Sequence, residues 1–156
     1  MATTTTKIAY AAAASITCDI ASKTSTQGQR SAVIDNSSNL YDDALVLVSV
    51  KIGTFTAGGY IAVYAYASAD DGTTYETGGS TNAAYNTING GEKLLGVIIP
   101  TSSTTTNTGV FTVAQAYGGV MPRNWGIIIW QSNCGTLSST ESDHTKKYQG
   151  VTYTQS

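Results

Sequence analysis

The chain has 156 residues, with eight basic and ten acidic side chains and a formal net charge of −2 at pH 7. Charged residues make up only 12% of it against the roughly 25% that is usual, so Thr, Ser, Asn and Gly supply much of the polar surface. This length predicts one domain with its own core, and the missing basic face argues against nucleic acid or an anionic membrane as a partner.

Residues 1–14 are rich in Thr and Ala and carry too little apolar bulk to fold alone. We predict that they form a flexible N-terminal arm, which is ordered only where something holds it. The arm lacks the apolar stretch of about 7–15 residues that a signal peptide requires, and no segment approaches the roughly 20 apolar residues of a membrane span. A single β-sandwich domain is expected to follow over residues 15–156.

Strand-like runs rich in β-branched and aromatic residues follow the arm, separated by Gly, Asn and Ser turns. These runs lie at 15–21, 29–35, 44–52, 59–68, 93–100, 109–115, 125–132 and 144–153. None has a helical period, and the glycine-rich connection 53–59 has the length of a hairpin turn. About eight strands in one domain predict an all-β fold, an antiparallel two-sheet sandwich of the jelly-roll type.

Two of these runs, 44–52 and 125–132, are apolar on both faces, because their Val and Ile residues alternate with further apolar side chains. The second faces carry Leu45, Leu47, Ile128 and Trp130. A strand of a free-standing sandwich shows one polar face, so we predict that a neighbouring subunit or the arm covers these second faces and that the protein is oligomeric. The alternative is that the runs form central strands covered by the long connection after residue 68.

That connection, residues 69–92, is longer than usual and predicts either a functional loop or a short extra hairpin. Its start reads SADDGTTYETGG and places Asp70 beside Asp71. These two are weak candidates for a calcium site, because the ligand spacing of a calcium-binding loop is absent. Asp71 and Gly72 after an alternating strand instead predict a type I′ hairpin turn.

The sequence offers little for catalysis. His144 is the only histidine and no G-x-S-x-G motif accompanies it, so we do not expect a catalytic triad. One His with two remote cysteines does not supply a zinc ligand set. Cys18 and Cys134 are expected to be separate, semi-buried thiols, with a disulfide between them as the open alternative. We therefore predict a protein that is not an enzyme and holds no cofactor.

Five phrases in a fixed order, covering the chain from about residue 30 to its end, carry a family resemblance. They read NSSNLYDDALVLVSVKIGT, YIAVYAYASADDGTTYE, KLLGVI, VFTVAQAYGGVMPRNWGIII and KYQGVTY. In this order they resemble a group of small virion structural proteins of tailed bacteriophages. The resemblance implies a capsid decoration (cement) protein, often a homotrimer, that is assembled in the bacterial host cytoplasm, lies on the capsid surface and bridges subunits of the major capsid protein. It carries over no catalytic residue.

An alternative is a glycan- or receptor-binding module of a tail or head fibre, which would use tyrosines and the loop 69–92. A head–tail connector or tail subunit is a third interpretation. Tyrosine suits interfaces, because its ring can be buried while its hydroxyl stays in contact with water. Alternation places three tyrosines on one face of 59–68. The candidate interface residues are Lys7, Ile8 and Tyr10 of the arm, with Tyr60, Tyr64, Tyr66 and Tyr75.

Overall fold

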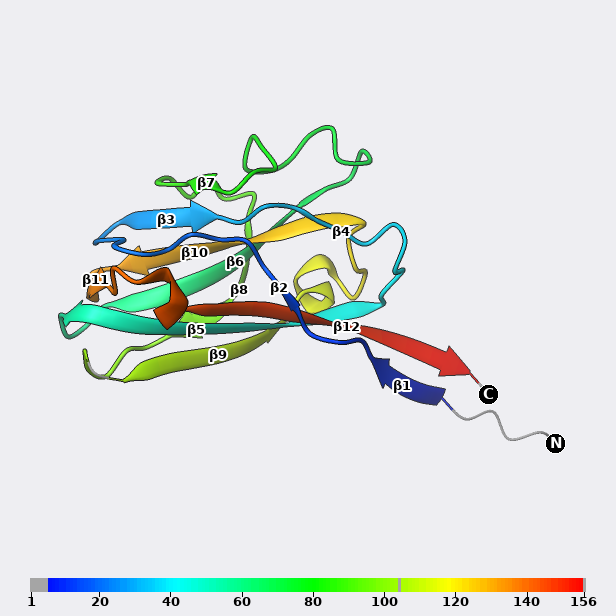
Figure 1. Ribbon diagram of the computed structural model, residues 1–156. Helices are drawn as coiled ribbons and strands as arrows, with labels where there is room; N and C mark the ends of the chain where they lie inside the picture. The colour runs from blue at the N-terminus through cyan, green and yellow to red at the C-terminus, as the bar shows by residue number, and fades with distance from the viewer. Residues whose placement is uncertain (1–5, 104, 156) are drawn as a thin grey trace.

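The computed structural model describes residues 6–103 and 105–155. Two antiparallel sheets pack face to face, and each contains six strands (Figure 1). The predicted all-β, two-sheet sandwich is confirmed, whereas its jelly-roll connectivity stays a prediction. The described chain has twelve strands where about eight were expected, because four strands of only two or three residues and a strand within the predicted arm add to the long ones.

Sheet A is built around the long strand β5. Its members are β1 (Thr6–Tyr10), β2 (Ala14–Ser15), β5 (Asp43–Phe55), β9 (Thr106–Thr112), β11 (Gly135–Leu137) and β12 (Thr145–Gln155). β12 pairs with one edge of β5 and β9 pairs with the other. β1 pairs with the end of β12, so the first and last strands of the chain are neighbours.

Sheet B is built around β10 and β6. Its members are β3 (Gln27–Arg30), β4 (Ile34–Asp35), β6 (Tyr60–Ser68), β7 (Ala83–Ala84), β8 (Lys93–Ile98) and β10 (Asn124–Ser132). Two single-turn 3₁₀ helices, η1 (Ala114–Tyr117) and η2 (Glu141–Asp143), lie in the connections. Within the described chain, no helix has the length and apolar character that crossing a membrane requires.

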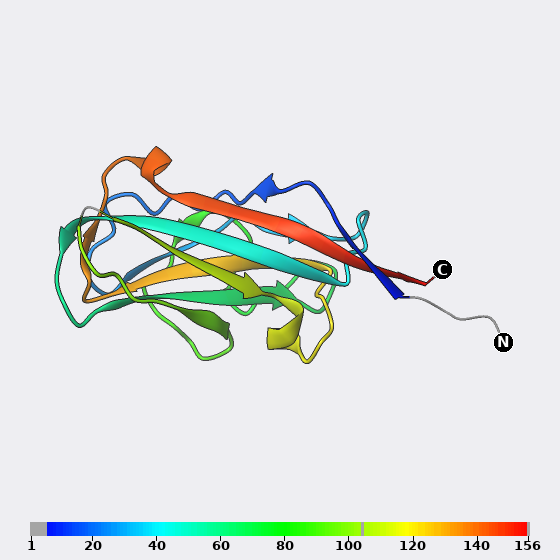
Figure 2. The same cartoon turned by 90° about the horizontal axis from the view of Figure 1, so that it is seen from below.

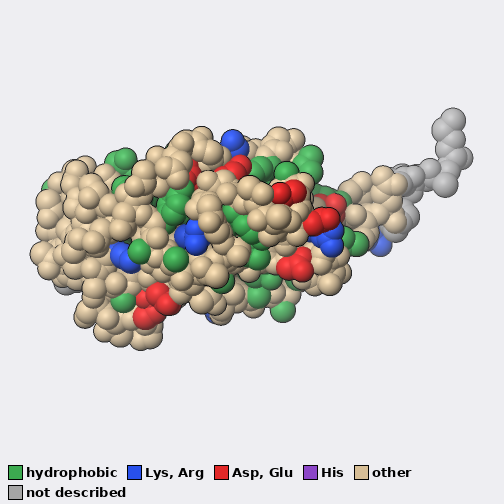
Figure 3. Space-filling view, turned by 90° about the horizontal axis from the view of Figure 1, so that it is seen from above, with side chains coloured by type: hydrophobic (Ala, Val, Ile, Leu, Met, Phe, Trp, Pro, Cys, Tyr) green, Lys and Arg blue, Asp and Glu red, His purple; other side chains and the backbone are tan. Residues whose placement is uncertain are grey.

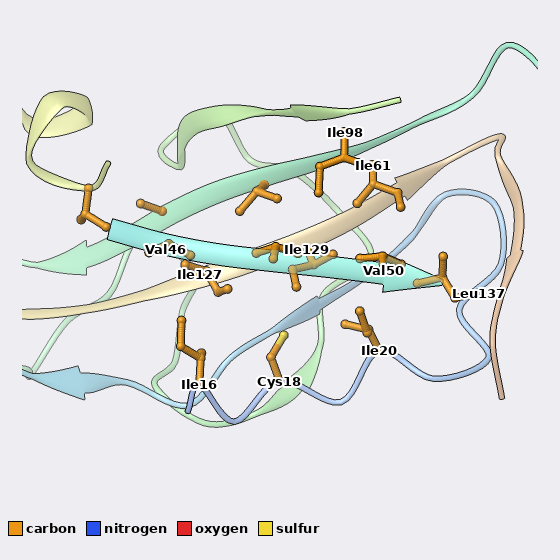
Figure 4. Packing of buried hydrophobic residues seen from close by; sticks show 14 of the residues in the cluster. Ile16, Cys18, Ile20, Val46, Val50, Ile61, Ile98, Ile127, Ile129 and Leu137 are labelled. Carbon is orange, nitrogen blue, oxygen red and sulfur yellow. The ribbon is translucent and has the colours of Figure 1, made fainter. Parts of the chain in front are cut away.

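The core lies between the sheets and follows from the alternation of β5. Every second residue from Ala44 to Ile52 is buried, because alternate side chains of a strand point to opposite faces. Val46 and Val50 of β5 meet Ile127 and Ile129 of β10 across the core (Figure 4). Each fully buried Val or Ile contributes roughly 1.5–3 kcal/mol of hydrophobic stabilisation.

The predicted strand 15–21 is only partly a strand. Residues 16–20 keep the alternation, with Ile16, Cys18 and Ile20 buried in the core (Figure 4), but they form no ladder. The segment crosses between the two sheets, since Ile16 N donates to the Lys146 carbonyl at 2.9 Å and Ala32 N donates to the Thr17 carbonyl at 2.8 Å. It therefore covers the open side of the sandwich and cannot pair along either sheet.

The connection 53–59 is not a hairpin turn. β5 belongs to sheet A and β6 to sheet B, so this segment carries the chain from one layer to the other. Gly59 is required there, because a Cβ at this position would lie 2.2 Å from the backbone of Asn133 and Cys134. The strands were predicted at the correct places, but their pairing with one another was wrong.

Both cysteines are free, as predicted, and they are fully buried where partial burial was expected. Burial raises the pKa of the Cys18 thiol to about 12, although the nearby Lys146 ammonium acts in the opposite direction. A thiol this far from ionisation at neutral pH is a core side chain and a poor nucleophile.

Candidate functional site

The long connection 69–92 covers the outer face of sheet B. Tyr66 of β6, Ile128 of β10 and Tyr85 of the connection form a second buried cluster there, separate from the main core. The only strand in the connection 69–92 is the two-residue β7, which pairs with β3. The second apolar face of β10 is thus covered by the chain itself, so the prediction that a neighbour or the arm covers it is wrong and the alternative is correct.

A buried arginine holds this connection against the sheet. Arg30 Nε donates to the Thr81 carbonyl at 3.0 Å and Arg30 Nη1 donates to the Thr77 carbonyl at 2.9 Å. Gly79 leaves room for the guanidinium, because a Cβ there would lie 2.7 Å from Arg30 Nη2. In the described part of the chain Arg30 forms no ion pair, so backbone carbonyls compensate its charge.

A buried carboxylate closes the other end of the connection. Glu92 accepts hydrogen bonds from the Tyr85 hydroxyl, from Asn89 N at 3.1 Å and from Gly90 N at 2.8 Å. Burial acts to raise the pKa of Glu92, but these hydrogen bonds together hold it below its usual range. Burial and the Glu92 charge raise the pKa of Tyr85 to about 12.

The predicted type I′ turn forms at the start of the connection. Asp71 has φ 56° and Gly72 has φ 85°, and Thr73 N donates to the Asp70 carbonyl at 3.3 Å. No returning strand follows, because β8 and β10 already occupy the two edges of β6. The turn was therefore predicted correctly and the hairpin was not.

Asp70 stabilises this turn with its side chain. Its Oδ1 accepts hydrogen bonds from Ser68 Oγ at 2.6 Å and from Thr74 N at 2.7 Å. The Ser68 hydroxyl, followed by the Thr74 amide, lowers the pKa of Asp70 to about 2. Among residues 6–103 and 105–155, no three His, Cys, Asp or Glu side chains are grouped to hold a metal ion. The two weak calcium candidates therefore serve the turn and a surface ion pair.

A hollow of about 770 Å³ opens between this turn and residues 117–123. Tyr75 and Tyr117 contribute its aromatic lining, and its charged groups are Asp70, Asp71, Glu76 and Arg123. Arg123 Nη1 lies 2.6 Å from Asp71 Oδ1 in an exposed pair, which contributes at most about 1 kcal/mol. The hollow combines aromatic rings with three carboxylates and one guanidinium, so its formal charge is negative.

Tyr75 and Tyr117 are held in place by neighbours. The Tyr75 ring meets the Tyr66 ring edge to face at a centroid distance of 5.9 Å. Tyr117 Oη donates to Glu76 Oε2 at 3.4 Å. Burial raises the pKa of Tyr117, and the Glu76 charge adds to the shift, so this hydroxyl stays a hydrogen-bond donor at neutral pH.

The structure corrects one of the predicted interface tyrosines. Tyr66 is fully buried, and its hydroxyl donates to the Ser31 carbonyl at 2.7 Å, so it cannot contact a partner. Tyr60 is exposed, and Tyr64 and Tyr75 are half-buried. Alternation identified one face of β6 correctly, but it could not show that the connection 69–92 covers part of that face.

His144 is a structural residue in this fold. Its Nδ1 accepts a hydrogen bond from Lys51 N at 3.3 Å, and its Nε2 lies 3.2 Å from the Ser138 carbonyl, to which the neutral ring donates. Burial lowers the pKa of His144, although the Ser138 carbonyl acts in the opposite direction. Both ring nitrogens are therefore engaged within the protein.

A second candidate surface is the terminal ribbon, which we define as β1 together with residues 152–155 of β12. It projects from one end of the sandwich, with Thr6 and Gln155 opposite each other at its tip (Figures 1 and 2). Ile8 lies opposite Tyr153, so they share a face with Tyr10, and their exposed fractions are 54%, 53% and 57%. Lys7 is also exposed and lies on the other face. The arm prediction covered residues 1–14, of which residues 1–5 lie outside the described chain.

The outer face of sheet A carries a second group of partly exposed apolar side chains, separated from the ribbon along β12 by the buried Val151 and by Gln149. Along β12, alternation places Tyr153 on the same face as Lys147, which lies opposite Leu47. Leu47 lies in turn opposite Val110, which is 59% exposed. Leu45, Leu47, Val110 and Lys147 are among the residues that line a shallow hollow of about 290 Å³ on this face. No described segment covers this face as the connection 69–92 covers sheet B.

Charged groups are mixed in sign elsewhere on the surface. On the face shown in Figure 3, acidic and basic side chains lie interspersed in small groups among apolar and uncharged polar ones. Comparisons with models of protein families, with curated protein sequences and with solved structures found no match. The function must therefore be argued from the residues and surfaces described above.

Proposed function

We propose that this protein is a structural component of a tailed-bacteriophage virion. In this role it decorates the outer surface of the capsid as a homotrimer and bridges subunits of the major capsid protein. The order of sequence phrases motivates the virus class. The observation that carries the proposal is the surface formed by the terminal ribbon and the outer face of sheet A, which is apolar, low in charge and uncovered.

Such a surface suits binding to another protein. Val110 and Ile8 are more than half exposed, and single exposed apolar residues are common, but here Ile8 lies beside Tyr153 and Val110 lies beside Leu47. Uncharged Thr and Gly around them lose little hydration energy on contact with a partner. A ligand that binds only the assembled shell stabilises that shell by mass action. The proposed function is thus mechanical, and it requires neither catalysis nor a cofactor.

Copy number per particle tests this proposal directly. Quantitative mass spectrometry of purified virions should give an amount of this protein comparable to that of the major capsid protein. A handful of copies per particle would contradict decoration and would point to a tail, fibre or connector position. His144→Gln should destabilise the isolated protein, because it removes a buried ring that is bonded to Lys51 N and to the Ser138 carbonyl. Virions that carry the folded variant should stay intact, and a loss of function beyond the folding defect would argue for catalysis.

A second candidate function is glycan binding, favoured by the hollow beside the turn at Asp70. Its volume of about 770 Å³ lies within the roughly 300–1,000 Å³ of ligand pockets. Tyr75 and Tyr117 offer ring surface to sugar C–H groups, while the carboxylates and Arg123 offer partners for hydroxyls. The excess of acids favours neutral or amino sugars over anionic ones.

Thermal-shift measurements with a panel of neutral, amino and sialylated oligosaccharides would test this candidate. Glycan binding predicts a stabilisation by neutral or amino sugars that the Arg123→Ala variant loses. The decoration role predicts no response to any sugar, so the two functions give different results in the same experiment.

A further inference from the structure

We propose that the free edge of β1 pairs with β1 of a second copy of the chain, antiparallel, with the two Ile8 residues directly opposite each other. The contact joins two copies by two-fold symmetry. It is independent of the proposed place on a capsid, because both partners are the same polypeptide. Four observations lead to this pairing: the direction of the backbone groups of β1, the exposure of the terminal ribbon, the register that the residues of β1 favour, and the position of the ribbon at one end of the sandwich.

The backbone of β1 has one used edge and one free edge. Ala11 N donates to the Gly150 carbonyl at 2.9 Å, so Ala11 directs its N–H toward β12. In an antiparallel strand the direction alternates from residue to residue. Ala9 and Lys7 therefore also face β12, and the N–H and C=O groups of Ile8 and Tyr10 point away from it. These groups form a template for another strand.

The terminal ribbon is poorly supported as it stands. All five residues of β1 are exposed, and so are the last three described residues of β12. A two-stranded ribbon is marginally stable in water, whereas three or more strands with an apolar face hold together. Pairing two ribbons gives a four-stranded sheet with Ile8, Tyr10 and Tyr153 of each copy on one face.

The register follows from the residues of β1. With Ile8 opposite Ile8, Lys7 lies opposite Ala9 and Thr6 opposite Tyr10, so all five residues of the strand are paired. A slide of two residues in one direction puts the two lysines directly opposite each other, which is unfavourable. A slide in the other direction leaves only residues 8–10 of each β1 paired. The centred register is therefore the one with most hydrogen bonds and without directly opposed charges.

The antiparallel arrangement keeps the two sandwiches apart. β1 runs from the tip of the ribbon back toward the sandwich, and the free edge of β1 faces away from β12 (Figures 1 and 2). An antiparallel partner strand therefore places the second sandwich beyond the tip, away from the first. If copies form trimers around three-fold axes, ribbons meeting at the two-fold axes between trimers would link them into a network.

Disulfide trapping with the Ile8→Cys variant tests the register. Residues opposite each other in a hydrogen-bonded pair have Cα atoms about 5.5 Å apart, which lies within the roughly 4.4–6.8 Å of a disulfide. Mild oxidation of the full-length protein should give covalent dimers on a non-reducing gel. Cys18 and Cys134 are buried and should not react.

The matched control is Tyr10→Cys, which has nearly the same exposure on the same strand edge. In the centred register the two Tyr10 residues are offset by four positions, about 13 Å along the strands, so this variant should not cross-link. A mixture of Thr6→Cys and Tyr10→Cys should give the mixed dimer. Equal cross-linking of the Ile8 and Tyr10 variants would indicate random collision and would overturn the proposal.

A proline variant tests the free edge by a route that needs no cysteine. Ile8→Pro removes an N–H that points away from β12, so it should abolish dimers while leaving the ribbon itself intact. Sedimentation equilibrium should show a dimer for the wild-type protein at high concentration and a monomer for this variant. A wild-type monomer at every concentration, or cross-links from position 8 to a capsid protein alone in virions, would overturn the pairing of two copies.

Discussion

The outer faces of the two sheets have similar apolar sequence patterns, but the described chain covers only the outer face of sheet B. On sheet B, Ile128 and Tyr66 are fully buried, because the connection 69–92 folds over them and Arg30 holds it there. On sheet A, Leu47 is only half-buried and Val110 is exposed. A strand that is apolar on both faces therefore indicates that something covers the second face, and only the fold shows whether the chain itself supplies the cover.

The largest effect should come from truncating the covered face. Ile128→Ala should lower the free energy of unfolding by about 2–5 kcal/mol, because it leaves a cavity beneath the connection. Leu47→Ala on the uncovered face should cost about 1 kcal/mol or less, since part of this side chain stays in water in both states. Urea denaturation of the two variants measures the difference, and equal costs would mean that sheet A is covered in the isolated protein as well.

Replacing Arg30, which holds the connection 69–92 against sheet B, should have the next largest effect on stability. Arg30→Met keeps most of the aliphatic volume but leaves the carbonyl of the buried Thr77 without its donor, at about 1–3 kcal/mol, whereas the carbonyl of the exposed Thr81 can bond to water. Hydrogen exchange should become faster in residues 77–85 and stay unchanged in β9. The exposed Arg123→Ala serves as the control and should change stability by about 1 kcal/mol or less.

A charge on the uncovered face should disturb binding more than folding. Val110→Asp should change the free energy of unfolding by about 0.5 kcal/mol or less. It should reduce occupancy on virions by about tenfold or more, because a contact would bury an unpaired carboxylate. Val120→Asp places the same charge at another exposed valine, away from sheet A, and should leave occupancy unchanged. Full occupancy with Asp at position 110 would show that this face does not touch the shell.

The smallest expected effect is that of acid on the turn at Asp70. The pKa of Asp70 is about 2 in the folded protein against 3.8 for a free side chain, so its hydrogen bonds stabilise the fold above about pH 3.8 and lose their effect as the pH falls toward 2. The protection factors of the amides of residues 70–76, which correct for the pH dependence of intrinsic exchange, should fall over this range. Asp70→Asn should remove the pH dependence of those protection factors, and an unchanged acid response in the variant would assign it to other carboxylates.

The long strands of this fold could be predicted because apolar side chains alternate along their local sequence. The spans of β5, β6 and β10 follow from side chains that repeat every second residue. β1 was missed because its support comes from the other end of the chain, with Thr6 opposite Gln155. No local pattern reports such a partner.

The anchors of the connection 69–92 could not be found in the sequence for a related reason. Arg30 is a single basic residue in a short strand, and its partners are backbone carbonyls, which leave no trace in residue type. Glu92 binds mainly amides and one tyrosine. The turn at Asp71 and Gly72 was predictable, because its backbone angles demand those residue types.

The pairing of β1 with β12 also sets an order in time. During synthesis β1 leaves the ribosome well before its partner residues 151–155. The ribbon therefore cannot form until residues 151–155 have emerged, since its two strands are separated by about 140 residues of sequence. A chain released too early lacks the ribbon and every contact made through it, so incomplete molecules would be left out of any assembly that depends on this end of the protein.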